Sequence, residues 1–231
     1  MDFRALPERL AQVRAEIVRR QAAGGWTHPV TLVAVTKGFG LDAVTAALDA
    51  GLSDLGENRI QEALEKIDAS SGRGAAWHMI GHLQRNKARF VPGRFALVHS
   101  VDSEPLAAEL ERRAAEQEVT VRVLLQVNVA GEAQKSGCEP AAAPGLAHAV
   151  AGHAHLTLEG LMTVAPLTDD EAVQRRTFRA LRALRDALQG EEEALWLPAL
   201  SMGMSGDYGI AVEEGATMLR LGTALFGLRT A

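Results

Sequence analysis

Residues 32–38 read LVAVTKG, a run of small apolar residues that ends in a threonine, a lysine and a glycine. Side chains of a strand alternate between its two faces, so Val33, Val35 and Lys37 share one face. Lys37 could be a solvated residue that ends a buried strand. It could instead point into a pocket, where burial or a neighbouring cation would keep the amine uncharged and able to attack a carbonyl. This stretch alone leaves both interpretations open.

Further along the chain, apolar runs of strand length alternate with segments of helical periodicity. The expected strands are TLVAVT (31–36), SDLGE (53–57), WHMIG (77–81), ALVHSV (96–101), VRVLLQVNV (121–129), TLEGLM (157–162), LPALSM (197–202) and MLRLG (218–222). The expected helices between them cover residues 41–51, 58–67, 83–91, 103–117 and 144–153, a long segment through Leu181 and Leu188, and 208–215. Such alternation predicts a parallel sheet covered by helices.

Eight βα units in one chain favour a closed (β/α)8 TIM barrel over an open sheet. Before the first strand, Phe3, Leu6, Leu10, Val13 and Ile17 recur at helical spacing, which predicts an additional N-terminal helix that ends at the glycine pair 24–25. No linker rich in proline, glycine or serine divides the 231 residues. We therefore expect a single domain over residues 1–231.

Composition excludes several classes of protein. The formal net charge is −5, whereas nucleic acids and anionic membranes reward a basic face. Cys138 is the only cysteine, so neither an internal disulfide nor a zinc site built on several thiolates is expected. No signal peptide or membrane-spanning stretch is evident. We expect a cytoplasmic protein with neither a nucleic-acid nor a membrane partner, and, without a heptad seam, a monomer.

The loops after the last two strands are rich in small residues. In TIM barrels, functional residues lie at the C-terminal ends of strands, and these two loops often bind phosphate. The first contains Ser201, Gly203, Ser205, Gly206 and Gly209, and the second contains Gly222 and Thr223. Glycines here could simply make tight turns, but two such loops beside Lys37 favour an anion site built from backbone N–H groups.

Three other residues have competing interpretations. Arg220 lies within the last strand, where a buried guanidinium needs either a carboxylate of the barrel or a ligand atom that accepts its hydrogen bonds. Asn58, three residues before Gln61, resembles a capping box, although a cap at a barrel mouth can also face a ligand. His78 is interpreted as a hydrogen-bonded core histidine. No metal-ligand spacing and no G-x-S-x-G motif occur.

Several motifs together resemble a known family. They are LVAVTKG, GENRIQEALEK, WHMIGHLQRNKA, HSVDS, VNVAGEAQKSGC, LEGLMTVAP and LSMGMSGDYGIAVEEGATMLRLGTALFG, which together cover nearly the whole chain. The sequence resembles the pyridoxal 5′-phosphate homeostasis proteins, single-domain relatives of the barrel domain of alanine racemase. Thr36 stands where the family more often has serine, and GDY replaces a commoner acidic pair after Ser205.

The resemblance implies a cofactor and its ligands. Lys37 would carry pyridoxal 5′-phosphate as an internal aldimine, and Ser201, Gly222 and Thr223 would hold the phosphate. Arg220 would face the pyridine nitrogen, and Asn58 would lie near the ring. The resemblance also implies exchange of the cofactor, with other B6 vitamers and pyridoxal-phosphate-dependent apoenzymes as further partners.

The chemistry of these residues favours a carrier over an enzyme. An arginine at the pyridine nitrogen keeps that nitrogen unprotonated, which weakens the ring as an electron sink. The chain also has no second domain to supply an opposing base, and we expect its only tyrosine, Tyr208, to pack over the phosphate end. The alternatives are a single-domain amino-acid racemase and a lysine-dependent aldolase acting on a phosphosugar. Lys135 is expected in a surface loop or at the rim of the site.

Overall fold

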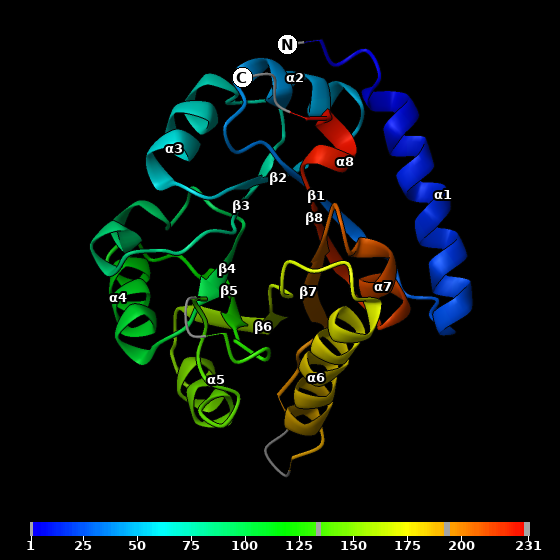
Figure 1. The fold of residues 1–231 in the computed structure, drawn as a ribbon. Helices are drawn as coiled ribbons and strands as arrows, with labels where there is room; N and C mark the ends of the chain where they lie inside the picture. The colour runs from blue at the N-terminus through cyan, green and yellow to red at the C-terminus, as the bar shows by residue number, and fades with distance from the viewer. Residues whose placement is uncertain (1, 133–134, 192–194, 229–231) are drawn as a thin grey trace.

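Eight parallel strands close into a barrel in the order β1 to β8, with β1 paired to β8 (Figure 1). The computed structural model describes residues 2–132, 135–191 and 195–228. The strands are β1 (Thr31–Val35), β2 (Asp54–Glu57), β3 (Ala76–Met79), β4 (Leu97–Val101), β5 (Val121–Gln126), β6 (Leu156–Met162), β7 (Ala199–Met204) and β8 (Met218–Leu221). The predicted (β/α)8 barrel is therefore confirmed. Parts of the expected 1–231 domain and of the VNVAGEAQKSGC motif lie outside the described residues.

Helices follow the strands and cover the outside of the barrel (Figure 1). They are α2 (Leu41–Asp49), α3 (Ile60–Ala69), α4 (Glu104–Ala115), α5 (Ala143–Ala151), α6 (Glu171–Gln189), α7 (Tyr208–Glu213) and α8 (Thr223–Phe226). Between β3 and β4, where we expected a helix over 83–91, the chain forms only a 3-10 helix, η1 (Arg85–Phe90). Among the described helices, none could span a membrane.

The predicted N-terminal helix is present as α1 (Leu6–Gly24), and it lies against the barrel beside α7 and α8 (Figure 1). Its buried face consists of Leu6, Leu10, Val13 and Ile17. It ends at Gly25, whose φ of 73° is left-handed and suits glycine.

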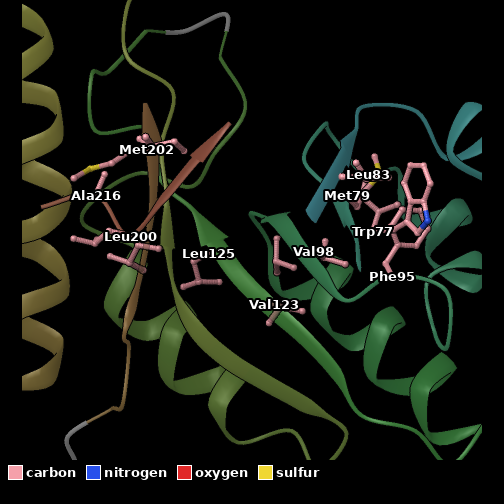
Figure 2. Packing of buried hydrophobic residues seen from close by; sticks show 14 of the residues in the cluster. Trp77, Met79, Leu83, Phe95, Val98, Val123, Leu125, Leu200, Met202 and Ala216 are labelled. Atoms are coloured by element: carbon pink, nitrogen blue, oxygen red, sulfur yellow. The ribbon is translucent and has the colours of Figure 1, made fainter. Parts of the chain in front are cut away.

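Two apolar layers hold the barrel. Outward-facing side chains of the strands pack beneath the helices, and Figure 2 shows Trp77, Met79, Leu83 and Phe95 gathered in this layer. A smaller inner cluster, which fills part of the barrel interior, consists of Leu97, Leu124, Met162 and Ala199. A packed interior, rather than a pore, leaves room for function only at the ends of the barrel.

Candidate functional site

A cavity of about 520 Å³ opens where β1, β2, β7 and β8 end. This volume is typical of a small-molecule site. Its lining consists of Val35, Lys37, Phe39, Asn58, Ile80, Val164, Met204, Ser205, Gly206, Arg220, Gly222 and Thr223. Five of the six predicted site residues are thus brought together, and Ser201 is the exception.

Lys37 lines the cavity but is exposed to solvent. Strand alternation predicts that Val33, Val35 and Lys37 share one face, and the structure agrees: the side chains of Val33 and Val35 both lie against Gly56, and Val35 lines the cavity together with Lys37. Each of the two interpretations of Lys37 is thus correct in part: the residue is solvated, and it also lines a cavity. β1 ends at Val35, so Lys37 stands two residues beyond the strand, at the rim of the mouth.

Asn58 reaches the cavity because a glycine that follows the neighbouring strand β3 leaves space for its backbone. A Cβ on Gly81 would lie 2.4 Å from the carbonyl oxygen of Asn58, closer than protein atoms approach. The capping-box interpretation of Asn58 was wrong. Helix α3 begins at Ile60, its N-cap is Arg59, and it has no side-chain cap hydrogen bond.

Small residues of the last two loops form one side of the cavity. Two backbone N–H groups converge there, because Gly222 N and Ala224 N donate to Ser205 Oγ over 3.2 and 3.0 Å. Ser205, Gly206, Gly222 and Thr223 all line the cavity. Gly203 is different: it is buried, and a Cβ there would lie 2.6 Å from Ala211 Cβ, so this glycine serves packing.

Arg220 is a buried cation at the floor of the cavity, with only 4% of its surface exposed. Its Nη1 donates to Ser201 Oγ over 2.6 Å and its Nη2 to the carbonyl oxygen of Thr163 over 2.8 Å. Burial lowers its pKa to about 10, which still leaves it charged at neutral pH. Among the described residues, no carboxylate lies within ion-pair distance of Arg220.

Ser201 lies beneath the cavity as part of a hydrogen-bonded chain through the barrel. Its hydroxyl is 2.8 Å from His99 Nδ1, His99 Nε2 is 2.8 Å from His78 Nδ1, and His78 Nε2 is 3.0 Å from Asp54 Oδ1. The hydrogen bond from His78 lowers the pKa of Asp54, and burial lowers that of His99 well below its usual value. The interpretation of His78 as a hydrogen-bonded core histidine is confirmed.

The direction of each bond in this hydrogen-bonded chain follows from the two residues at its ends, Arg220 and Asp54. Arg220 can only donate, and ionised Asp54 can only accept. With one proton on each imidazole, every bond must then point the same way: Arg220 donates to Ser201, Ser201 to His99, His99 to His78, and His78 to Asp54. The single proton of the Ser201 hydroxyl is donated to His99, so Ser205 is better placed than Ser201 to donate to an anion in the cavity.

Tyr208 and Lys135 both lie outside this cavity. Tyr208 lines a separate hollow of about 270 Å³ together with Glu16 and Arg20. Lys135 Nζ donates to the carbonyl oxygen of Ala165 over 2.9 Å, which ties the loop after β5 to the loop after β6. In the part of the chain that the structure describes, no three His, Cys, Asp or Glu side chains come together as a metal site.

The sequence matches one protein family over almost its whole length. The model of the family described as "Alanine racemase, N-terminal domain" matches residues 10–230. The pyridoxal phosphate homeostasis protein of Pseudomonas aeruginosa is 44% identical over 225 residues, which are 97% of this chain and 96% of that protein. The chain belongs to the family of pyridoxal phosphate homeostasis proteins. The pyridoxal phosphate homeostasis protein of Aquifex aeolicus is 40% identical over 96% of this chain and 97% of its own.

Solved structures agree with this family assignment. PipY of Synechococcus elongatus, determined with PLP bound, has a TM-score of 0.85 and 36% identity, covering 96% of this chain and all of that one. PipY without PLP has a TM-score of 0.87 and 37% identity, with the same coverage. An alanine racemase of Clostridium difficile has a TM-score of 0.75 and 12% identity over 60% of its chain, a likeness of fold alone.

Proposed function

We propose that this chain binds pyridoxal 5′-phosphate and takes part in its homeostasis, holding the cofactor as a Schiff base without turning over an amino acid. Relatives that match nearly the full chain carry the corresponding name, and PipY, with the same fold, was determined with PLP bound. Other B6 vitamers would compete for the site, and apoenzymes that need the cofactor would receive it. The carrier would act as a monomer.

The residues of the cavity fit each part of this cofactor. Lys37 Nζ would add to the aldehyde carbon, and loss of the carbonyl oxygen as water would leave a C=N bond to the lysine. Ser205 and Thr223 would hold the phosphate through their hydroxyl groups, and the Gly222 N–H would leave Ser205 Oγ to donate to a phosphate oxygen. Asn58 would lie beside the ring.

The observation that carries the proposal is the buried charge of Arg220. A guanidinium is costly to bury without an acceptor of comparable strength. Among the described residues, Arg220 donates to a hydroxyl and a carbonyl, and the charge of Asp207 acts on it only from beyond ion-pair distance. A ligand nitrogen with a free lone pair, such as the pyridine nitrogen, would accept one of its remaining N–H groups. Arg220 would thereby be satisfied only in the loaded protein.

The same residue argues against amino-acid turnover. A permanent donor at the pyridine nitrogen keeps that nitrogen unprotonated, so the ring withdraws electrons weakly. A racemase would also need a base on the face opposite Lys37. Tyr208 lies in the separate hollow with Glu16 and Arg20, which leaves it poorly placed for that role.

Borohydride reduction of the purified protein, followed by peptide mass mapping, tests the proposal. The lysines of the chain are Lys37, Lys66, Lys87 and Lys135, so the modified peptide is identified unambiguously. We expect a visible absorption band, reduced label on Lys37 alone, and loss of both in Lys37→Ala. Lys87→Ala, a variant at a lysine outside the cavity, should keep both.

Two results would count against the proposal. A colourless protein that gains no label when mixed with pyridoxal phosphate would remove the binding function. Interconversion of L- and D-alanine or serine at ordinary enzyme rates, roughly one turnover per second or faster, would replace the carrier by a racemase.

A further inference from the structure

A buried cluster of charges lies behind β1 and β2, on the side away from the cavity. It consists of Glu57, at the end of β2, and Glu62 and Lys66 of α3, and we call it the Lys66 cluster. Lys66 Nζ lies 2.6 Å from Glu57 Oε1 and 2.8 Å from Glu62 Oε1. Thr36 Oγ1 also donates to Glu57 Oε1, over 2.6 Å.

This cluster holds the peptide groups on both sides of Lys37. Lys66 Nζ donates to the carbonyl oxygen of Thr36 over 2.8 Å, which belongs to the peptide group before Lys37. The backbone N–H of Gly38, in the peptide group after Lys37, donates to Glu62 Oε1 over 2.7 Å. The pair Glu62 and Lys66, four positions apart on α3, thus fixes the chain immediately before and after the exposed lysine.

Stability alone gives little reason for such a cluster. Glu57 is fully buried, burial raises its pKa, and its Oε2 has no hydrogen-bond partner among the described residues. Buried ion pairs can often be replaced by apolar residues of similar volume without loss of stability. The arrangement therefore needs another explanation, and the position of its hydrogen bonds around Lys37 supplies one.

We propose that Glu57, Glu62 and Lys66 are positioning residues that hold the backbone of Lys37 so that its amine meets a carbonyl in the cavity. The inference rests on the proposed Schiff base at Lys37. Because β1 ends at Val35, no strand pairing fixes Lys37 itself, and the turn hydrogen bond from Phe39 N to the Thr36 carbonyl oxygen leaves Gly38 free to move. The contact with Glu62 removes that freedom. An amine fixed at the right distance reacts faster than a mobile one.

Paired variants at Glu62 test the proposal, because this residue is partly exposed and its replacement should not prevent folding. Glu62→Gln keeps an oxygen that can accept from Gly38, whereas Glu62→Ala removes it. Glu65→Ala, at an exposed position of the same helix, is the matched control. We expect the rate of Schiff-base formation at saturating pyridoxal phosphate to fall about tenfold or more in Glu62→Ala, to fall less in Glu62→Gln, and to stay unchanged in the control.

Two readouts separate positioning from a general structural role. Pyridoxine 5′-phosphate has an alcohol in place of the aldehyde and cannot form the imine, so its affinity should change by less than about threefold in every variant. Amide hydrogen exchange at Gly38 in the cofactor-free protein should speed up in Glu62→Ala and remain slow in Glu62→Gln.

A second variant tests the two buried residues of the Lys66 cluster, Glu57 and Lys66. Glu57→Gln combined with Lys66→Met removes both buried charges, so neither is left unpaired, and it frees the Thr36 carbonyl oxygen from Lys66. We expect slower Schiff-base formation with an unchanged affinity for pyridoxine 5′-phosphate. Equal losses in both measurements, or an unchanged rate in both Glu62→Ala and the double variant, would overturn the proposal. Absence of any imine in the unaltered protein would instead refute the function assigned to Lys37.

Discussion

Two glycines near the cavity differ in what their missing side chain makes room for. Gly203 has a φ of +93°, and a Cβ there would lie 2.6 Å from Ala211 Cβ. Gly222 has a φ of −106°, and its Cβ would meet only the carbonyl oxygen and Cβ of Val35, at ordinary contact distances of 3.7 and 3.8 Å. The first glycine is required by the fold, whereas the second faces the cavity and would face its ligand.

Alanine at each position should therefore separate folding from binding. Gly203→Ala should lower the free energy of unfolding by about 2–4 kcal/mol, through backbone strain and overpacking. Gly222→Ala should lower the free energy of unfolding by at least about 2 kcal/mol less than Gly203→Ala does. It should nevertheless weaken pyridoxal phosphate binding more than about tenfold, because the new methyl group occupies the phosphate side of the cavity. Urea unfolding and cofactor titration measure the two effects. A Gly222→Ala protein that binds normally would place the phosphate elsewhere.

The sequence predicted which residues face the cavity, but it did not predict how far along the barrel axis each of them lies. Strand alternation correctly grouped Lys37 with Val33 and Val35. It could not reveal an irregularity between β7 and β8, where Ser201 pairs with Met218 but Met204 pairs with Arg220. That extra residue in β7 leaves Ser201 below the cavity and raises Ser205 to its mouth. Such a bulge depends on packing between strands, which no local pattern encodes.

The end of α7 is held to α6 by a cluster of arginines around one buried carboxylate. Glu214 is 3% exposed and lies 3.0 Å from Arg175, 2.9 Å from Arg179 and 3.2 Å from Arg182. Burial alone would raise the pKa of Glu214, but the hydrogen bonds from Arg179 and Arg175 outweigh it, and the pKa is lowered. The carboxylate form of Glu214 therefore stabilises the contact of these two helices.

Glu214→Gln should destabilise the protein by about 1–3 kcal/mol at pH 7, a value reduced for the partial exposure of the three arginines. A carboxyl with a lowered folded-state pKa contributes its stability above the unfolded value, near 4.5, and loses it as the pH falls towards the folded value. The difference between the two proteins should shrink from pH 7 to pH 3 in urea titrations. A difference that is constant with pH would assign the loss to packing.

Element boundaries show where local signals were insufficient. Run length and alternation located every strand, including the weak SDLGE segment that forms β2. The capping pattern at Asn58 misplaced the start of α3 by two residues, because the chain needs those residues to cross the barrel mouth past Gly81. Segment 83–91 carries a helical pattern but forms only the six-residue 3-10 helix η1 before the chain enters β4.

The closed barrel brings together polar side chains that no sequence pattern links. His78, His99, Ser201 and Arg220 come from β3, β4, β7 and β8, and they meet only because the sheet closes on itself. The hydrogen-bonded chain that these side chains form begins at Asp54, at the N-terminal ends of the strands. It ends with Arg220 at the cavity on the opposite side of the barrel. The orientation of Arg220 is thus a property of the whole barrel rather than of β8.

His99, at the centre of this hydrogen-bonded chain, should couple global stability to pH. It is fully buried, and burial, together with the charge of Arg220, lowers its pKa well below 6.5. The folded protein therefore leaves His99 neutral at a pH where the unfolded chain binds a proton. With more protons bound in the unfolded state, stability must fall as the pH drops below about 6.5, by up to about 1.4 kcal/mol per pH unit for this one group.

Urea unfolding of the cofactor-free protein between pH 7 and pH 5 measures this dependence. His99→Gln should be less stable at pH 7, because it disturbs a buried hydrogen-bonded chain, but its stability should fall less steeply with decreasing pH. His153→Gln is the matched control, because His153 lies near the start of β6 and takes no part in the hydrogen-bonded chain of His99. An equal pH slope in the unaltered protein and in His99→Gln would mean that the histidine is protonated within the folded barrel, and the single direction of its hydrogen bonds would then be wrong.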